Sequence, residues 1–205
     1  MANVDNPRGF KPVKTLSGAP ISGKIKSFPV SSSYAGTLAV GDAVLLNAGN
    51  VQRAVSGSDV LGVVAYIGSG TSNTTFGEAE SFDPTDLTDP GILPGSTGGV
   101  VGVVLANDVV FEAQTDDSST APVVGAGLDL VATAAVAGTN TQSVMEVDHD
   151  GSPAANSGAG DAKVFEVPEF NSENLKATAP TNKNDGTSAN AAVHVVFTSP
   201  TFAQV

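Results

Sequence analysis

The chain has 205 residues and a formal net charge of −12, and 40% of its residues are hydrophobic. It contains no cysteine, which excludes disulfide bonds and thiolate metal sites. The first residues lack an apolar signal core, and no run of about 18 apolar residues occurs. We therefore expect no membrane contact and a product made in the cytoplasm.

Charge is distributed unevenly along the chain. Residues 1–26 hold five basic groups and one acidic group, whereas residues 27–205 hold four basic and twenty acidic groups. This asymmetry favours docking of the basic segment on an acidic protein surface, in a neighbouring copy or in another protein. A solvated tail without a partner is the alternative. Because an acidic body repels phosphates, we expect no nucleic-acid partner.

Residues 1–20 are predicted to form an extended basic N-terminal arm, because three prolines hold φ near −65° and remove backbone donors. Its apolar residues would gain more by lying along another surface than by folding on themselves; they are Phe10, Val13 and Leu16. Residues 21–205 are predicted to form an acidic β-rich body, with the alternative that residues 121–205 make a separate outer sub-region.

The first part of the body is predicted to consist of short strands. Residues 21–40 alternate loosely and predict one or two strands, and Pro29 places one of them at a sheet edge. Residues 42–46, 51–55 and 60–67 are apolar segments separated by Asn/Gly and Ser/Gly turns. Their short connections predict an antiparallel meander of three strands.

Residues 69–98 form a long polar connection, and loops of this length in compact domains are usually functional or disordered. It is the most acidic loop, and we predict that it contacts another subunit and receives that subunit's basic arm. The residues assigned to this contact are Phe76, Phe82, Asp83, Asp86 and Asp89.

The remaining segments are also predicted to be strands. Residues 100–105 form a continuous apolar run, typical of a strand buried on both faces, and residues 109–114 alternate. Residues 121–137 are the one possible helical region, but residues 128–136 mix helix formers with β-branched residues and are predicted as strand with irregular structure. Further strands are predicted at 143–147, 163–167 and 191–198. The fold class is therefore all-β, a small antiparallel β-barrel or sandwich-like body with an extended N-terminal arm and little helix.

No catalytic, cofactor or metal site is predicted. His149 lies between two aspartates, but adjacent residues of a strand point to opposite faces and do not converge on an ion. His194 alternates with valines and is interpreted as a packed or hydrogen-bonded histidine. The acidic loop has oxygen ligands but lacks the EF-hand spacing. No Gly-x-Ser-x-Gly elbow occurs, so we expect no enzyme.

Two segments carry a resemblance to known proteins. The opening contains Gly9-Phe10-Lys11-Pro12-Val13, and the body contains Gly41-Asp42-Ala43-Val44, Asn50-Val51 and Val60-Leu61-Gly62-Val63-Val64. The first resembles the start of small virion proteins of marine and cyanobacterial tailed phages. The second is similar to capsid cement proteins and lambda-type head decoration proteins, where a Gly-Asp-x-Val strand precedes a Leu-Gly-Val strand. Compact members of that family are much shorter than this chain.

The resemblance implies an accessory capsid protein. Such a protein binds the outer face of the assembled shell, often as a homotrimer, and cements neighbouring capsomers, so its partners are the major capsid protein and further copies of itself. Docking on the shell would then be carried by the arm residues Arg8, Phe10, Lys11, Val13 and Lys14.

Several other functions remain open from the sequence. A tail, spike or fibre component of the virion would have similar composition. The major shell protein would need a long spine helix, which the sequence does not predict. A glycan-active β-protein would need paired carboxylates in a cleft. An adhesin or surface-layer module is the remaining alternative.

Overall fold

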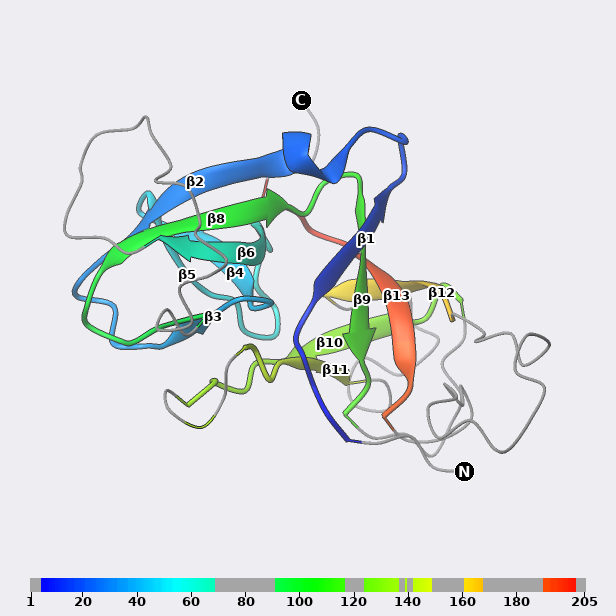
Figure 1. Cartoon of the computed structure of the whole chain (residues 1–205). Helices are drawn as coiled ribbons and strands as arrows, with labels where there is room; N and C mark the ends of the chain where they lie inside the picture. The colour runs from blue at the N-terminus through cyan, green and yellow to red at the C-terminus, as the bar shows by residue number, and fades with distance from the viewer. Residues whose placement is uncertain are drawn as a thin grey trace, which may run out of the picture.

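The computed structural model describes residues 5–68, 91–116, 124–136, 139, 142–148, 161–167 and 190–201. Within these ranges the chain is all-β and sandwich-like, as predicted, with three antiparallel sheets and no closed barrel (Figure 1). The described residues contain one short 3-10 helix, η1 (Ile21–Lys24). None of them belongs to a helix long and apolar enough to cross a bilayer.

Two large sheets and one small sheet make up the structure. The five-stranded sheet has the order β2-β8-β6-β4-β5 and consists of β2 (Ile25–Val30), β4 (Ala43–Asn47), β5 (Asn50–Arg53), β6 (Gly62–Gly68) and β8 (Gly99–Leu105). The six-stranded sheet has the order β1-β9-β13-β12-β10-β11 and consists of β1 (Lys11–Thr15), β9 (Val109–Gln114), β10 (Gly127–Val131), β11 (Glu146–Asp148), β12 (Ala162–Glu166) and β13 (Ala192–Phe197). The two-stranded sheet pairs β3 (Leu38–Ala39) with β7 (Ile92–Leu93).

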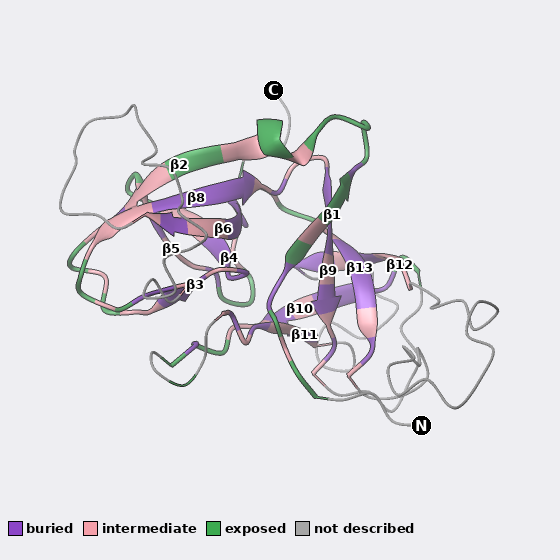
Figure 2. Cartoon of the chain, viewed as in Figure 1, coloured by how far each residue is buried: buried purple, intermediate pink, exposed green. Residues whose placement is uncertain are grey.

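The main core lies where the two large sheets face each other. Val63 and Val104 of the five-stranded sheet share one buried cluster with Phe111 and Val195 of the six-stranded sheet. A second cluster belongs to the five-stranded sheet and its neighbours and includes Val103. Figure 2 shows the buried positions running along β8, β9, β10 and β13, while β1 and β2 are largely exposed or half-buried. The buried residues thus form one large cluster shared by the two large sheets and a second cluster on the five-stranded sheet.

β8 and β2 occupy the positions that the sequence predicts. β8 pairs with β2 on one side and β6 on the other, and its continuous apolar run is buried on both faces. β2 is an edge strand and contains Pro29, which has no backbone donor for a further neighbour.

The predicted meander of β4, β5 and β6 is wrong in its strand order. The three strands are antiparallel, but β6 pairs with β4 and leaves β5 at the edge. A two-residue turn joins β4 to β5, whereas residues 54–61 give the chain room to cross back. β6 is apolar along most of its length, so it gains more from burial in the central position beside β8 than β5 would gain there. β5 carries the polar residues Gln52 and Arg53.

Close packing at Gly62 explains why the Leu-Gly-Val pattern contains glycine. Gly62 pairs with Val44 on β4 and with Leu105 on β8. A Cβ atom at this position would lie 2.1 Å from the backbone oxygen of Val104. Only glycine allows β6 to approach β8 this closely.

The described part of the N-terminal segment is extended but does not form a free arm. β1 pairs with β9 as an edge strand of the six-stranded sheet. Phe10 is 2% exposed in the main core, and its N–H donates to the Gly41 carbonyl at 2.8 Å. These residues lie along another surface, as expected, but that surface belongs to the body of the same chain, and the aromatic ring of Phe10 is buried there.

The chain changes sheets between Leu105 at the end of β8 and Val109 at the start of β9.

The predicted outer sub-region begins at residue 121, which lies outside the described residues. The strand predicted at 143–147 is found slightly later, as β11, with Met145 and Val147 buried. Ile92 and Leu93, which fall within the predicted long connection of residues 69–98, form the short strand β7.

Candidate functional site

The five residues predicted to dock on a shell differ in accessibility. Arg8 and Lys11 are exposed, and Val13 and Lys14 are also accessible on β1. Phe10 is a core residue, so its side chain is unavailable for a docking surface. The structure therefore leaves four of the five predicted residues on the surface of the molecule.

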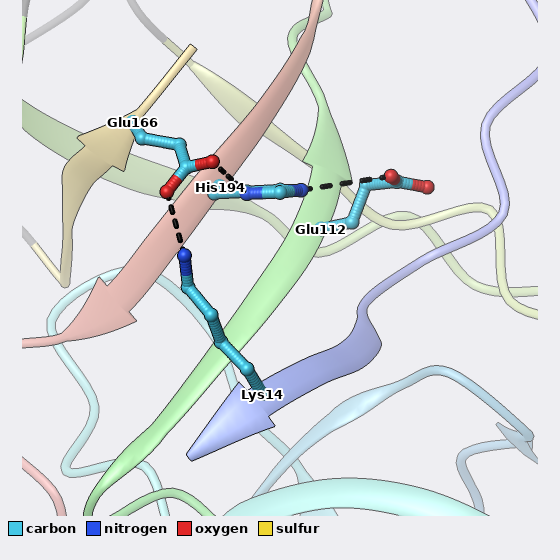
Figure 3. Close-up of polar contacts among 4 residues, drawn as sticks. All are labelled: Lys14, Glu112, Glu166 and His194. Atoms are coloured by element: carbon cyan, nitrogen blue, oxygen red, sulfur yellow. Dashed lines mark hydrogen bonds and ion pairs between the residues drawn. The ribbon is translucent and has the colours of Figure 1, made fainter. Parts of the chain in front are cut away.

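Lys14 belongs to a chain of charged contacts on the six-stranded sheet. Its Nζ lies 2.7 Å from Glu166 Oε2 and 5.0 Å from the centroid of the Phe165 ring. The other oxygen of Glu166, Oε1, lies 3.2 Å from His194 Nδ1, and His194 Nε2 lies 3.8 Å from Glu112 Oε2. Figure 3 shows how the four side chains follow one another, from Lys14 through Glu166 and His194 to Glu112, and that they come from β1, β12, β13 and β9.

Strand register brings these side chains together. His194 pairs with Glu112 on β9 and with Glu166 on β12, and an irregularity in β12 between Val164 and Glu166 shifts the register there. Alternate residues of β13 enter the core, so His194 faces away from it. The interpretation of His194 as a packed histidine with polar contacts is confirmed, although its two glutamate neighbours were not predicted.

Electrostatics favour the ionised form of Glu166. Hydrogen bonding to the Lys14 ammonium lowers the pKa of the Glu166 carboxyl, and His194 contributes in the same direction. A neutral imidazole donates from only one nitrogen, whereas an imidazolium donates from both. The two ring nitrogens point at different carboxylates, so these groups do not converge on a single ion. Among the described residues no group of three or more His, Asp or Glu is arranged to hold a metal.

A second charged contact ties the β1–η1 connection to the turn after β8. Ser17 donates from its N–H to Asp108 Oδ1 at 2.9 Å and from its hydroxyl to Oδ2. Lys24 Nζ lies 3.3 Å from Asp108 Oδ2. These contacts lower the pKa of Asp108, and the hydrogen bond from the Ser17 hydroxyl makes the largest contribution. Two of the basic groups in residues 1–26, Lys14 and Lys24, are thus ion-paired within the chain itself.

Asp42 is a buried carboxyl that sequence reasoning did not single out. Its side chain is fully buried, and Oδ2 accepts the Ala39 N–H at 2.8 Å. Burial raises the pKa of Asp42 to about 6, and the Ser143 hydroxyl, the Ala39 N–H and Arg53 offset only part of this effect. The available signal was a carboxylate placed directly before an otherwise apolar strand in the Gly41-Asp42-Ala43-Val44 pattern.

The predicted subunit-contact residues lie outside the described residues: Phe76, Phe82, Asp83, Asp86 and Asp89. His149 lies outside them as well.

Comparisons with known proteins found no relatives. No family model matches the chain, and neither a curated protein nor a solved structure matches it.

Proposed function

We propose that this chain is a structural protein of a tailed-phage virion, which binds the outside of the assembled capsid and cements neighbouring capsomers. The proposal starts from the resemblance of two motifs, Gly41-Asp42-Ala43-Val44 and Leu61-Gly62-Val63, to decoration proteins. In the structure these motifs lie at the starts of β4 and β6, which are neighbours in the five-stranded sheet. A structural role of this kind requires exposed contact surface and no catalytic residues.

The single observation that carries the proposal is the exposed basic edge of an otherwise acidic chain. β1 ends the six-stranded sheet and carries Lys11 and Lys14, with Arg8 just before it. Lys11 has no ion pair among the described residues, unlike Lys14. An accessible cation at a sheet edge suits a partner surface rich in carboxylates, on the major capsid protein or on another copy within a homotrimer.

A charge reversal tests this docking role better than a truncation. Removal of residues 1–20 would also remove Phe10 and β1, and with them part of the core. Lys11→Glu instead changes an exposed side chain on β1. Lys163→Glu on β12 is the matched control, because it changes net charge equally but lies outside β1.

Binding should be measured with purified protein and shells that lack it. We expect saturable binding at a fixed copy number per shell, a loss of about tenfold or more in affinity for Lys11→Glu and little change for Lys163→Glu. Equal losses in the two variants would disprove the role of β1. A wild-type protein that ignores shells but assembles into rings or fibres would point to a tail, spike or fibre component.

A further inference from the structure

Asp42 lies where three separate segments of the chain meet. The N-terminal segment arrives through Phe10, whose N–H donates to Gly41 O at 2.8 Å. The segment before β11 arrives through Ser143, whose N–H donates to Val40 O at 2.9 Å. β6 arrives through Val64, whose N–H donates to Asp42 O at 2.9 Å. The backbone of residues 40–42, which carries the Asp42 carboxyl, therefore anchors the N-terminal segment together with the two others.

The surroundings of Asp42 satisfy only one of its two carboxyl oxygens. Oδ2 accepts the Ala39 N–H, but Oδ1 has no hydrogen-bond partner among the described residues, since the nearby Ser143 hydroxyl does not meet hydrogen-bond geometry. Arg53 of β5 is the charged group that acts on Asp42, and its Nη1 donates to Thr37 O instead. A carboxylate in this position is buried without full compensation.

The space above Asp42 leaves little room for adjustment. A Cβ atom at Gly9 would lie 2.4 Å from both Gly41 O and Ser143 Cβ. Gly41 is equally confined, because a Cβ there would lie 2.7 Å from Arg8 O. Gly9 therefore packs directly against Ser143, whose side chain acts on Asp42, so a shift of Ser143 would displace residues 8–10.

We propose that Asp42 makes the attachment of the N-terminal segment sensitive to pH, with the neutral carboxyl holding residues 8–10 against the body and the carboxylate loosening them. The neutral form can donate from Oδ1, which the carboxylate cannot. Ionisation places a negative charge in a buried site. Local opening of the segments packed around Asp42 exposes this charge to water and so lowers its energy. This inference concerns the fold alone and stands independently of the proposed function.

The direction of the pH dependence follows from burial. The pKa of Asp42 is about 6 in the folded chain and near 4 in an unfolded one, so the folded state holds its proton over a wider range. The stabilisation is fully present below about pH 4 and is lost as the pH rises through about 6. The unfolding equilibrium constant should therefore rise by about tenfold per pH unit across that window, from this group alone.

The contribution of Asp42 is isolated by comparison with Asp42→Asn, which keeps an oxygen acceptor for the Ala39 N–H but does not ionise. Amide exchange, expressed as protection factors, should be followed at Phe10 between pH 4 and 7. We expect protection of the wild-type Phe10 amide to fall by about tenfold or more with rising pH and that of Asp42→Asn to change by less than about threefold. Asp59→Asn, an exposed carboxyl in the same region of the chain, should behave as the wild type does. Equal pH dependence in wild type and Asp42→Asn would overturn the proposal.

A second measurement needs no variant. The carboxyl carbon of Asp42 in the wild-type protein should titrate in an NMR experiment with a midpoint above about 5, far from that of an exposed aspartate. A midpoint at or below that value would overturn the proposal even if Asp42→Asn fails to fold.

Discussion

The rings of Phe10 and Phe197 pack with their centroids 5.2 Å apart and their planes inclined at 50°. Phe197 also contacts Phe111 at 5.4 Å, so the N-terminal segment, β13 and β9 meet in one aromatic cluster. Tilted aromatic pairs of this kind add to the stabilisation that comes from burying their area. The N-terminal segment is therefore an integral part of the core.

Phe10→Ala should destabilise the protein by about 3–5 kcal/mol, because it removes a fully buried ring and leaves a cavity. Urea unfolding at neutral pH measures this loss. Val13→Ala changes a more exposed residue in the neighbouring β1 and should cost about 1 kcal/mol or less. Similar losses in the two variants would mean that Phe10 contributes no more than surface contact.

Gly62→Ala should cost about 3 kcal/mol, since a methyl group there would press against the Val104 carbonyl of β8 and neither backbone can yield. Gly23→Ala is the matched control, because a Cβ at Gly23 meets nothing within 4 Å. Thermal unfolding of the two variants provides the comparison. A Gly62→Ala protein as stable as Gly23→Ala would show that β6 and β8 separate readily.

The turn between β4 and β5 is open to improvement. Ala48 has φ of 48° and Gly49 has φ of 81°, the pattern of a type I′ turn, in which asparagine or glycine is preferred at the first position. Ala48→Asn should therefore raise the free energy of unfolding by about 0.5–1 kcal/mol. Ala48→Val should lower it, because a branched side chain tolerates this φ less well. Chemical denaturation of both variants tests the sign of each change.

The Lys14–Glu166 pair should stabilise the protein at neutral pH and cease to do so in acid. The lowered pKa of Glu166 means that its contribution is present above the pKa of the unfolded chain and is lost as the pH falls through the folded value. Both side chains are substantially exposed, so the effect is small and is screened by salt.

Lys14→Met tests this pair. The difference in unfolding free energy between wild type and Lys14→Met should shrink as the pH is lowered from 7 to 3, and also in high salt. Lys26→Met removes an exposed cation without an ion pair among the described residues and should show no such acid-dependent loss. A difference for Lys14→Met that is constant across the pH range would assign its role to packing on Phe165 instead.

Sequence patterns predicted the parts of the fold that depend on local burial. The apolar run of β8, the alternation of β9 and the edge position imposed by Pro29 each follow from the chemistry of a few neighbouring residues. Strand order was predicted less well, because β4 can pair with β5 and β6 at once and only the competition for the place beside β8 decides the arrangement.

The charged contacts were the hardest feature to predict. His194, Glu112 and Glu166 are far apart in sequence and meet only through the register of β9, β13 and β12. Phe10 was assigned to a docking arm because the prolines and lysines around it indicated an extended, exposed segment. Extended backbone is equally suited to an edge strand, and the sequence contains no local signal that distinguishes the two.

The return of the chain to the six-stranded sheet has a consequence during synthesis. Every strand of the five-stranded sheet lies between β1 and β9 in the sequence. On the ribosome β1 emerges early, but its pairing partner follows only after that whole sheet has been made. Closure of so long a loop is slow, and β1 stays unpaired until β9 has been made. We therefore expect nascent chains that stop short of β9 to expose the unpaired edge of β1 and to be prone to aggregation.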